Sequence, residues 1–324
     1  MNKKKSFLII FLSIITIFCA VYFLLISKNT ENSELNNSPN NPNTSDEVRF
    51  YESQNLGYPF WIAEEKGFLT ESGFDKSLKG VYLGSEANIV EWAKANLDVG
   101  ILSLDELLRI EGRYPDSFKA IFFIYDTNEE YSSSLVVKKG SGLASVNDLS
   151  GKKIAVGTDT EEFLLKEYLE ANGITDSQIS RLSRKDYSEQ LEKGSIDAVW
   201  VTEPYTSKLV LDGDGEILTN NPESDMSGAP YGVFVVNNDF YNRDPVMVES
   251  LKKALTMALG VTESEQREIM KEHLGEEWIQ IVTDRTFAKI SPAGEVDKSL
   301  LQKVADKMYE NGFLDKKIET VNIF

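Results

Sequence analysis

The sequence has very few of the side chains on which metal binding and nucleophilic catalysis usually depend. It holds one cysteine, Cys19, and one histidine, His273. One cysteine excludes an intrachain disulfide, and a Cys/His zinc site cannot be built from two such residues. Catalysis of the Ser/His/Asp or Cys/His type would depend on His273, which lies in a highly charged segment typical of a solvated helix face. We therefore expect no enzyme, no metal site and no cofactor.

Positive charge is also scarce in this sequence. Lysine and arginine number 34 against 52 aspartates and glutamates, which gives a net charge of −18. Such a surface repels phosphate backbones and therefore argues against a nucleic-acid-binding protein. An acidic surface that only keeps the protein soluble explains the same charge. The net charge therefore does not identify a binding partner.

The longest apolar run stands near the N-terminus. Residues Phe7–Ile26 contain no charge and no proline, and Lys3, Lys4 and Lys5 precede them. About twenty apolar residues match the hydrocarbon thickness of a bilayer, and the lysines favour a cytoplasmic N-terminus. We expect residues 1–27 to form a transmembrane helix that anchors the protein in the cell membrane, with the folded part on the extracytoplasmic side.

Two alternatives to this uncleaved anchor stay open. The first is a cleaved signal peptide, although a secretory apolar segment is usually shorter, at about 7–15 residues. The second is lipid attachment at Cys19. The bulky Phe18 precedes that cysteine and the apolar run continues beyond it, so a cysteine acting as a small apolar residue is the simpler interpretation.

Residues 28–47 are rich in Asn, Ser and Pro and predict a disordered tether. From Val48 onwards, short apolar strands alternate with amphipathic helices. This alternation predicts an α/β fold with mostly parallel sheets that helices cover on both faces. The pattern runs twice, and we expect two lobes. Residues 48–134 and 233–324 would form lobe 1, and residues 135–232 would form lobe 2.

Four segments resemble a known family. They are Gly-Tyr-Pro-Phe-Trp-Ile-Ala-Glu-Glu-Lys-Gly-Phe (57–68), Leu-Asp-Val-Gly-Ile (97–101), Asp-Leu-Ser-Gly-Lys-Lys-Ile-Ala-Val-Gly (148–157) and Gly-Ser-Ile-Asp-Ala-Val-Trp-Val-Thr-Glu-Pro-Tyr (194–205). In their order and spacing they are similar to the substrate-binding proteins of ABC importers for nitrate, sulfonates, taurine and thiamine-type pyrimidines.

The resemblance implies a two-lobed, periplasmic-binding-protein-like (Venus-flytrap) fold. It also implies delivery of a small organic solute, sulfonate- or taurine-like or pyrimidine-like, to an ABC permease and its ATPase. A membrane-tethered sensor or adaptor with the same fold is the alternative. An enzyme of the pyrimidine-synthase type is a weaker one, because such enzymes need a cysteine-rich stretch, which the folded part lacks, and a histidine, for which it offers only His273.

In open α/β sheets, ligands bind beyond the carboxyl ends of the strands, where helix N-termini point into the crevice. The turns at those ends supply the expected ligand contacts. They are Asn55, Tyr58, Ser85, Ser103, Asp126, Thr158, Asp159, Thr160, Glu203, Tyr205 and Tyr231. Each also has an ordinary structural interpretation, since Ser and Thr at these places are frequent helix N-caps.

Acidic side chains outnumber basic ones in these turns. Asp126, Asp159 and Glu203 fall there, whereas the only nearby cations are Arg184 and Lys185. Such a site suits a zwitterion or an amine-bearing heterocycle better than a dianion. We therefore expect an aminosulfonate or a pyrimidine-like solute in preference to a simple oxyanion.

Overall fold

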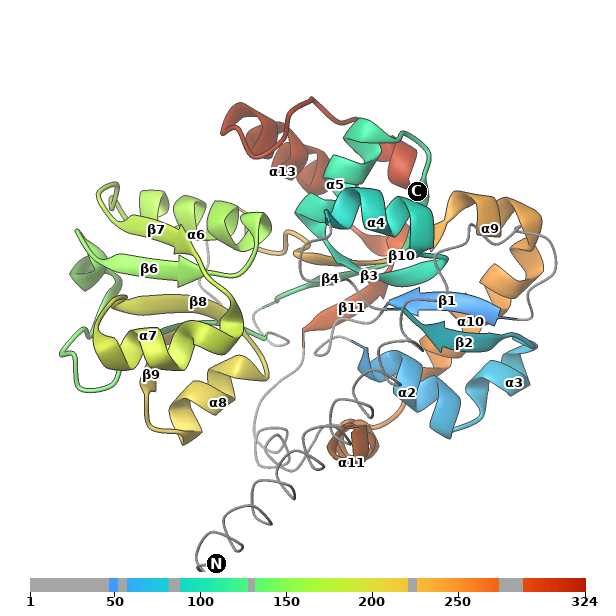
Figure 1. Cartoon of the computed structure of the whole chain (residues 1–324), viewed down its shortest axis with the longest axis horizontal. Coiled ribbons are helices and arrows are strands. Elements are labelled where there is room, and N and C mark those ends of the chain that lie inside the picture. Colours follow the sequence, from blue (N-terminus) through green and yellow to red (C-terminus); the bar gives the residue numbers. More distant parts are fainter. Residues whose placement is uncertain (1–46, 52–56, 82–87, 128–131, 221–225, 274–287) are drawn as a thin grey trace, which may run out of the picture. The chain divides into compact units, whose positions relative to one another are not determined.

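The computed structural model describes residues 47–51, 57–81, 88–127, 132–220, 226–273 and 288–324, which form two β-sheets with helices around them (Figure 1). The predicted transmembrane helix and nearly all of the predicted tether lie outside the described residues. Among the residues that are described, no helix is both long enough and apolar enough to cross a membrane.

The first sheet has six strands. They are β1 (Glu47–Tyr51), β2 (Ser77–Gly80), β3 (Val99–Ser103), β4 (Phe118–Tyr125), β10 (Gly232–Asn237) and β11 (Lys289–Pro292). Their order across the sheet is β11-β4-β10-β3-β1-β2. Strand β10 therefore returns from late in the chain and inserts between two early strands.

The second sheet has five strands. They are β5 (Ser133–Lys138), β6 (Lys153–Val156), β7 (Gln178–Arg181), β8 (Ala198–Thr202) and β9 (Gly215–Asn220), in the order β7-β6-β8-β5-β9. The chain thus passes from the first sheet to the second between β4 and β5, and returns between β9 and β10.

The prediction of mostly parallel sheets is wrong, because both sheets are mixed. Strand β1 pairs in parallel with β2 and β3, and β6 pairs in parallel with β7 and β8. The other pairings are antiparallel, namely β10 with β3 and β4, β11 with β4, and β5 with β8 and β9. Strands that enter from the other half of the chain are not joined to their neighbours by a βαβ crossover, so nothing requires them to run parallel.

Helices cover both faces of each sheet. The helices are α2 (Tyr58–Glu65), α3 (Phe68–Ser72), α4 (Ile89–Asn96), α5 (Leu104–Arg113), α6 (Asp159–Ala171), α7 (Tyr187–Lys193), α8 (Tyr205–Leu211), α9 (Asn238–Arg243), α10 (Pro245–Leu259), α11 (Glu263–His273) and α13 (Lys298–Glu310). One face of the six-stranded sheet packs against α5 and α13, and the other against α2 and α10.

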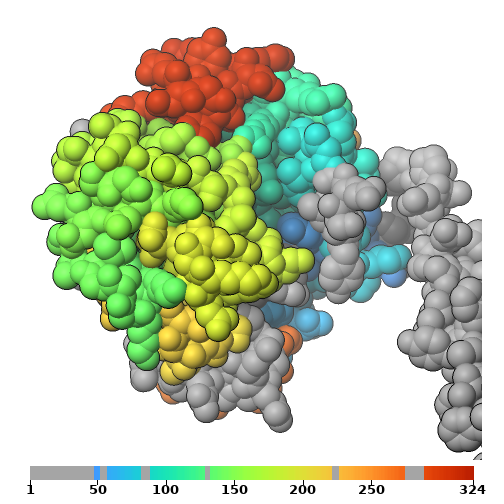
Figure 2. Space-filling model, turned by 60° about the vertical axis from the view of Figure 1, so that its left-hand side comes forward, coloured from blue at the N-terminus to red at the C-terminus, as the bar shows by residue number. Residues whose placement is uncertain are grey.

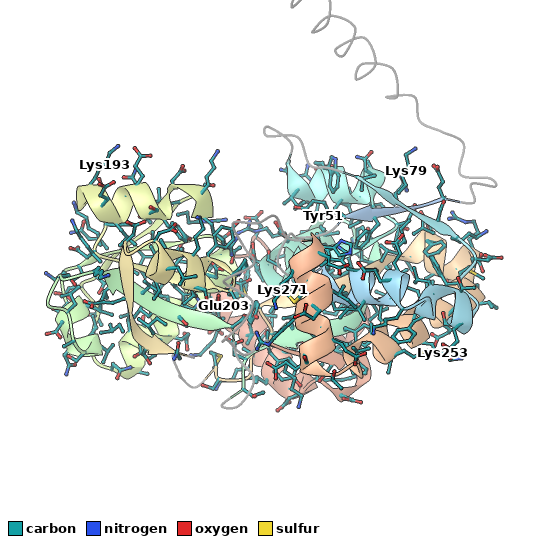
Figure 3. The ribbon with its side chains drawn as sticks, turned by 90° about the horizontal axis from the view of Figure 1, so that it is seen from below. Tyr51, Lys79, Lys193, Glu203, Lys253 and Lys271 are labelled. Atoms are coloured by element: carbon teal, nitrogen blue, oxygen red, sulfur yellow. The ribbon has the colours of Figure 1, made fainter. Side chains whose placement is uncertain are left out.

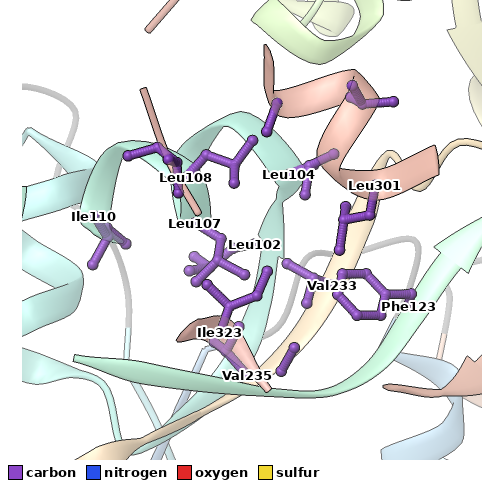
Figure 4. Packing of buried hydrophobic residues seen from close by; sticks show 14 of the residues in the cluster. Leu102, Leu104, Leu107, Leu108, Ile110, Phe123, Val233, Val235, Leu301 and Ile323 are labelled. Atoms are coloured by element: carbon purple, nitrogen blue, oxygen red, sulfur yellow. The ribbon is translucent and has the colours of Figure 1, made fainter. Parts of the chain in front are cut away.

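Alternating side chains along one strand show this two-sided burial. In β10, Val233 and Val235 join the core beneath α5 and α13, as Figure 4 shows, whereas Phe234 and Val236 join the core beneath α10. All of them are nearly inaccessible to solvent. A strand with period-two side chains reads as a continuous apolar run when both its faces are covered, which is why the sequence of β10 shows no polar alternation.

Two of the aspartates that carry the family resemblance hold strand ends together. Asp98 accepts a hydrogen bond from the backbone N–H of Arg49 at 2.9 Å, and Asp197 accepts one from that of Lys153 at 2.9 Å. Each aspartate precedes one strand and binds the neighbouring parallel strand. The two sheets therefore contain the same local device, and these motif residues are structural.

The helix expected to begin at Ser85 begins later. Its first residue is Ile89, and the side chain of Asn88 caps it by accepting from the backbone N–H of Val90 at 2.9 Å. Asn is as good an N-cap as Ser, which explains why the helix can begin after Asn88. Ser85 itself lies outside the described residues.

Candidate functional site

The same strand-to-helix unit occurs once in each sheet. Strand β3 leads into α5 through Ser103-Leu-Asp-Glu106, and β6 leads into α6 through Thr158-Asp-Thr-Glu161. Both follow the capping-box pattern, in which the fourth residue folds back onto the start of the helix. Glu106 Oε2 accepts from the N–H of Ser103 at 2.8 Å, and Glu161 Oε2 from that of Gly157 at 2.6 Å.

A cavity of about 160 Å³ lies where these two units meet. The six-stranded sheet and α5 contribute Tyr51, Ile101, Leu102, Ser103, Glu106, Tyr231 and Gly232 to its lining, and the other sheet with its connections contributes Thr158, Glu161, Arg184 and Thr202. We call this space the cavity. Side chains from both sheets line it, as a binding site between two lobes requires.

Arg184 is the cation of the cavity lining. It lies in a short 3₁₀ turn, Arg184–Asp186, and its Nη2 donates to Glu161, whose side chain is 4% exposed. Gly157 makes this packing possible, because a Cβ there would lie 2.9 Å from Arg184 Cζ. The glycine of the Val-Gly motif is thus needed for close approach.

Glu106 is the second carboxylate of the cavity lining, and it forms no ion pair within the part of the chain that the structure describes. It is partly buried and closely surrounded by protein, and this burial, together with the negative charge of Asp105, raises its pKa to about 7. Hydrogen bonding to Ser103 and the charge of Arg109 oppose the shift only in part. Burial, and then the charge of Glu106, also raise the pKa of Tyr51 across the cavity.

Three buried polar atoms at this place have no hydrogen-bond partner among the described residues. They are Ser103 Oγ, Arg184 Nε and Tyr187 Oη. Ser103 and Arg184 line the cavity, and Tyr187, which is 1% exposed, interacts electrostatically with Arg184 and Glu161. A buried donor without a partner costs about 1–3 kcal/mol, so natural structures rarely leave several together. Their grouping indicates a place for a polar ligand.

A polar contact between α5 and α6 adjoins the cavity, and its groups are all paired. The Oγ1 of Thr160 donates to Asp105 Oδ1 at 2.8 Å, and accepts from the N–H of Asp105 at 3.0 Å. Asp159 forms ion pairs with Arg109 and Arg181. Helix α13 extends the contact through an ion pair between Lys307 and Glu167. Figure 2 shows this C-terminal segment, in red, bordering the green segment that contains α6.

The predicted ligand contacts fall into groups. Ser103, Thr158 and Tyr231 line the cavity. Asp159 and Thr160 lie in the α5–α6 contact instead. Asn55, like Ser85, lies outside the described residues. Their roles as ligand contacts stay predictions.

Four other predicted contacts lie in neighbouring turns. The oxygens of Asp126 accept from the backbone N–H groups of Ser132 and Ser133 at 2.8 and 3.0 Å, where the chain enters β5, and burial raises the pKa of Asp126. Glu203 follows β8, and its Oε2 accepts from the N–H of Ser207 at 3.2 Å. Figure 3 shows Glu203 towards the junction of the two sheets, with Lys193 at the far end of the five-stranded one.

Tyr58 and Tyr205 complete that set. Each is the first residue of its helix, α2 and α8, and Tyr58 is buried. Tyr205 lies near Arg184 and Tyr187, since it affects the pKa of both. Neither tyrosine is among the residues that line the cavity.

Glu106, Glu161 and Tyr51 line the cavity although they are not among the residues predicted from the sequence. A signal for the two glutamates was present, because Ser-x-x-Glu and Thr-x-x-Glu mark capping boxes after predicted strands. That pattern explains the glutamates by local structure alone and therefore hid their exposure to the cavity. Within the described ranges, no group of three or more His, Cys, Asp and Glu side chains is arranged to hold a metal ion.

Comparison with known proteins identifies the family to which this chain belongs. A family model described as NMT1/THI5-like matches residues 57–268, which include both capping boxes and every described residue of the cavity lining except Tyr51. The chain belongs to the NMT1/THI5-like family. A protein of Bacillus subtilis named a putative aliphatic sulfonates-binding protein is 26% identical over 86% of this chain and 85% of its own length. One of Escherichia coli with the same name is 23% identical, and the match spans 57% of this chain and 60% of the relative's length.

Solved structures show the fold. The periplasmic aliphatic sulphonate-binding protein of Escherichia coli superimposes with a TM-score of 0.71 at 17% identity, over 87% of this chain and 92% of its own. The nitrate-binding protein of Synechocystis gives 0.64 at 14% identity, over 85% and 84%. A desulfurization enzyme gives 0.60 at 14% identity, over 86% and 96%. The chain therefore has the two-lobed periplasmic-binding-protein fold with mixed sheets.

Proposed function

We propose that this chain is an extracytoplasmic solute-binding protein of an ABC importer, and that its solute is a small organic sulfonate. The observation that carries the proposal is the cavity, which residues of both sheets line and where Ser103 Oγ and Arg184 Nε have no hydrogen-bond partner in the described ranges. The names of the two curated relatives support the choice of sulfonate.

The chemistry of the lining suits a sulfonate headgroup. A hydroxyl and a guanidinium N–H donate to sulfonate oxygens, and charge-assisted hydrogen bonds of this kind are about twice as strong as neutral ones. The N-termini of α5 and α6 flank the cavity and add favourable partial charge.

The two lobes would close over the solute. We propose that residues 48–134 with 233–324 form one lobe and residues 135–232 the other, so that each lobe contributes one capping-box unit to the site. Asp126, Glu203 and Tyr205 stay candidate contacts, because each lies in a turn between the sheets or at a helix start beside Arg184.

Delivery of the solute to the permease would take place at the membrane surface. We propose that residues 1–27 anchor the chain there and that residues 28–47 tether the folded part to a permease with its ATPase. Membrane fractions of cells that express the full chain should contain the protein, and deletion of residues 1–27 should leave it in the soluble fraction inside the cell. Equal partitioning of both forms would contradict the anchor.

A catalytic role is not part of the proposal. The single histidine, His273, ends α11, stacks on Trp61 and has its Nε2 2.5 Å from Glu65 Oε1. It does not line the cavity. The likeness to a desulfurization enzyme concerns the fold alone.

Calorimetric titration tests the function. Ethanesulfonate, taurine, nitrate and an aminomethylpyrimidine should be titrated into the folded part, and we expect the sulfonates to bind one per chain. Arg184→Lys should weaken their binding about tenfold, because lysine has no Nε–H donor in that position. Lys193→Arg, on the exposed end of α7, serves as the control. Binding of nitrate or the pyrimidine alone would contradict the proposed solute class.

A further inference from the structure

The charges that line the cavity do not favour a second anion. Of the described residues that line it, two carboxylates, Glu106 and Glu161, face one guanidinium, Arg184, which already forms an ion pair with Glu161. With both carboxylates ionised, an entering sulfonate would meet a net negative lining in a site partly removed from water. Like charges at close range there cost several kcal/mol, or force one group to take up a proton.

The groups around Glu106 determine which of the two carboxylates takes up a proton. Across the cavity it faces Tyr51 of β1, Tyr231 of β10, Glu161 of α6 and Arg184 of the 3₁₀ turn, and on its own helix Asp105 and Arg109. Arg109 forms ion pairs with Asp105 and Asp159, and Arg184 with Glu161. Among the described residues, Glu106 therefore has no ion-pair partner, and its charge is the one in the cavity that no cation balances.

We propose that Glu106 is a specificity-determining residue that binds the anionic solute in its neutral form, so that solute binding takes up one proton. This inference rests on the proposed function. Oε2 of Glu106 accepts from the N–H of Ser103, which leaves Oε1 to carry the proton and donate it to a sulfonate oxygen. The proton comes from solvent and returns to solvent when the solute leaves. The neutral acid, the Ser103 hydroxyl and the Arg184 Nε–H then form three donors around the anion.

Linkage gives the sign of the effect. The pKa of Glu106 is near 7 in the empty cavity, and we expect it to be higher in the complex. Below about pH 7 the affinity is then independent of pH. Above it, the dissociation constant rises about tenfold per pH unit. A cationic or zwitterionic solute that needs ionised Glu106 would show the opposite trend, so the sign also reports the class of solute.

Titration of ethanesulfonate in buffers with different ionisation enthalpies measures this directly. The sulfonate is ionised throughout, so any proton exchanged comes from the protein or the buffer. Near pH 8 we expect uptake of close to one proton per solute bound, falling towards zero below about pH 6. Glu106→Gln keeps a hydrogen-bond donor but cannot titrate, and its binding should be independent of pH. Glu249→Gln, an exposed residue paired with Lys252, should behave as the unaltered protein.

The outcomes separate this inference from the proposed function. Ethanesulfonate binding with no proton uptake and a constant affinity from pH 6 to pH 9 would overturn the role of Glu106 and leave sulfonate binding intact. Absence of sulfonate binding at every pH would instead overturn the proposed function. The buffer series needs only the unaltered protein, so the inference is tested even where Glu106→Gln fails to fold.

Discussion

The N-terminal ends of α5 and α6 have the same design but differ in how completely their groups are paired. At α6, Thr158 Oγ1 accepts from the N–H of Glu161 at 3.1 Å, and Glu161 binds both the backbone and Arg184. At α5, the Ser103 hydroxyl takes part in the capping box, but its oxygen has no hydrogen bond of good geometry, and among the described residues Glu106 has a backbone partner but no ion pair. The capping groups of α6 are thus fully paired without a ligand, whereas those of α5 are paired only in part.

This difference assigns different roles to equivalent residues. Groups that are fully paired stabilise the fold, because their hydrogen bonds offset the cost of burial. Groups that are buried but unpaired reduce stability until a ligand binds them, which is typical of functional sites. We therefore expect substitutions at the α6 end to affect stability most, and those at the α5 end to affect ligand binding most.

The largest expected effect is that of Glu161→Gln. The change leaves Arg184, whose side chain is 27% exposed, without its carboxylate partner. Removal of one member of a buried ion pair costs about 3–5 kcal/mol, and the partial exposure of Arg184 places our expectation near 3 kcal/mol. Urea unfolding at pH 7 measures it. A loss of unfolding free energy below about 1 kcal/mol would show that the groups at the start of α6 are no better paired than those at the start of α5.

Glu106→Gln at the equivalent position should stabilise the protein instead, by an amount that grows as the pH rises from about 4.5 to 7 and is complete above that range. The pKa of Glu106 is raised from 4.5 to about 7 in the folded state, so between these values the folded protein holds a proton that the unfolded chain has lost. Stability therefore falls as the pH rises through this window and is constant above it. The full shift is worth about 3 kcal/mol, and partial exposure lowers our expectation to about 2 kcal/mol.

Comparison of unfolding free energies at pH 4.5 and pH 8 measures the effect of Glu106→Gln. The variant and the unaltered protein should agree at the acidic pH and differ at the alkaline one, with the variant more stable. A variant less stable at pH 8 would mean that ionised Glu106 has a stabilising partner and would contradict the comparison.

The smallest expected effects are those of removing the two capping hydroxyls, of Thr158 and Ser103. Thr158→Ala removes a cap that makes its hydrogen bond and should cost about 1 kcal/mol, whereas Ser103→Ala removes a hydroxyl that has no hydrogen bond of good geometry among the described residues and should cost only a few tenths. Affinity for ethanesulfonate should weaken about tenfold in Ser103→Ala. Equal losses of stability in both variants, with unchanged affinity in Ser103→Ala, would remove Ser103 from the site.

Sequence patterns predicted the α/β fold correctly but not the strand directions. Apolar runs such as those of β8 and β10 indicate burial on both faces, and burial is the same for parallel and antiparallel pairing. The direction depends on where the chain crosses between the sheets, which involves pairings between residues more than 100 positions apart, such as Gly232 with Ser103.

The candidate site was predicted in part, for a related reason. Ser103 and Thr158 stand at helix starts after strands, and such positions can be read from the sequence. The role of Glu106 in the cavity depends on its burial and on how the neighbouring cations pair with other carboxylates. Only the packing of two distant segments determines both. Arg184 was noticed as a nearby cation, but its ion pair with Glu161 required the structure.

The most direct test of the account is a crystal structure of the protein with ethanesulfonate. We predict that the sulfonate lies in the cavity, with oxygens within hydrogen-bond distance of Ser103 Oγ, Arg184 Nε and the carboxyl group of Glu106. A sulfonate bound elsewhere, or one that contacts the α6 end and leaves Ser103 and Glu106 untouched, would contradict the central claim.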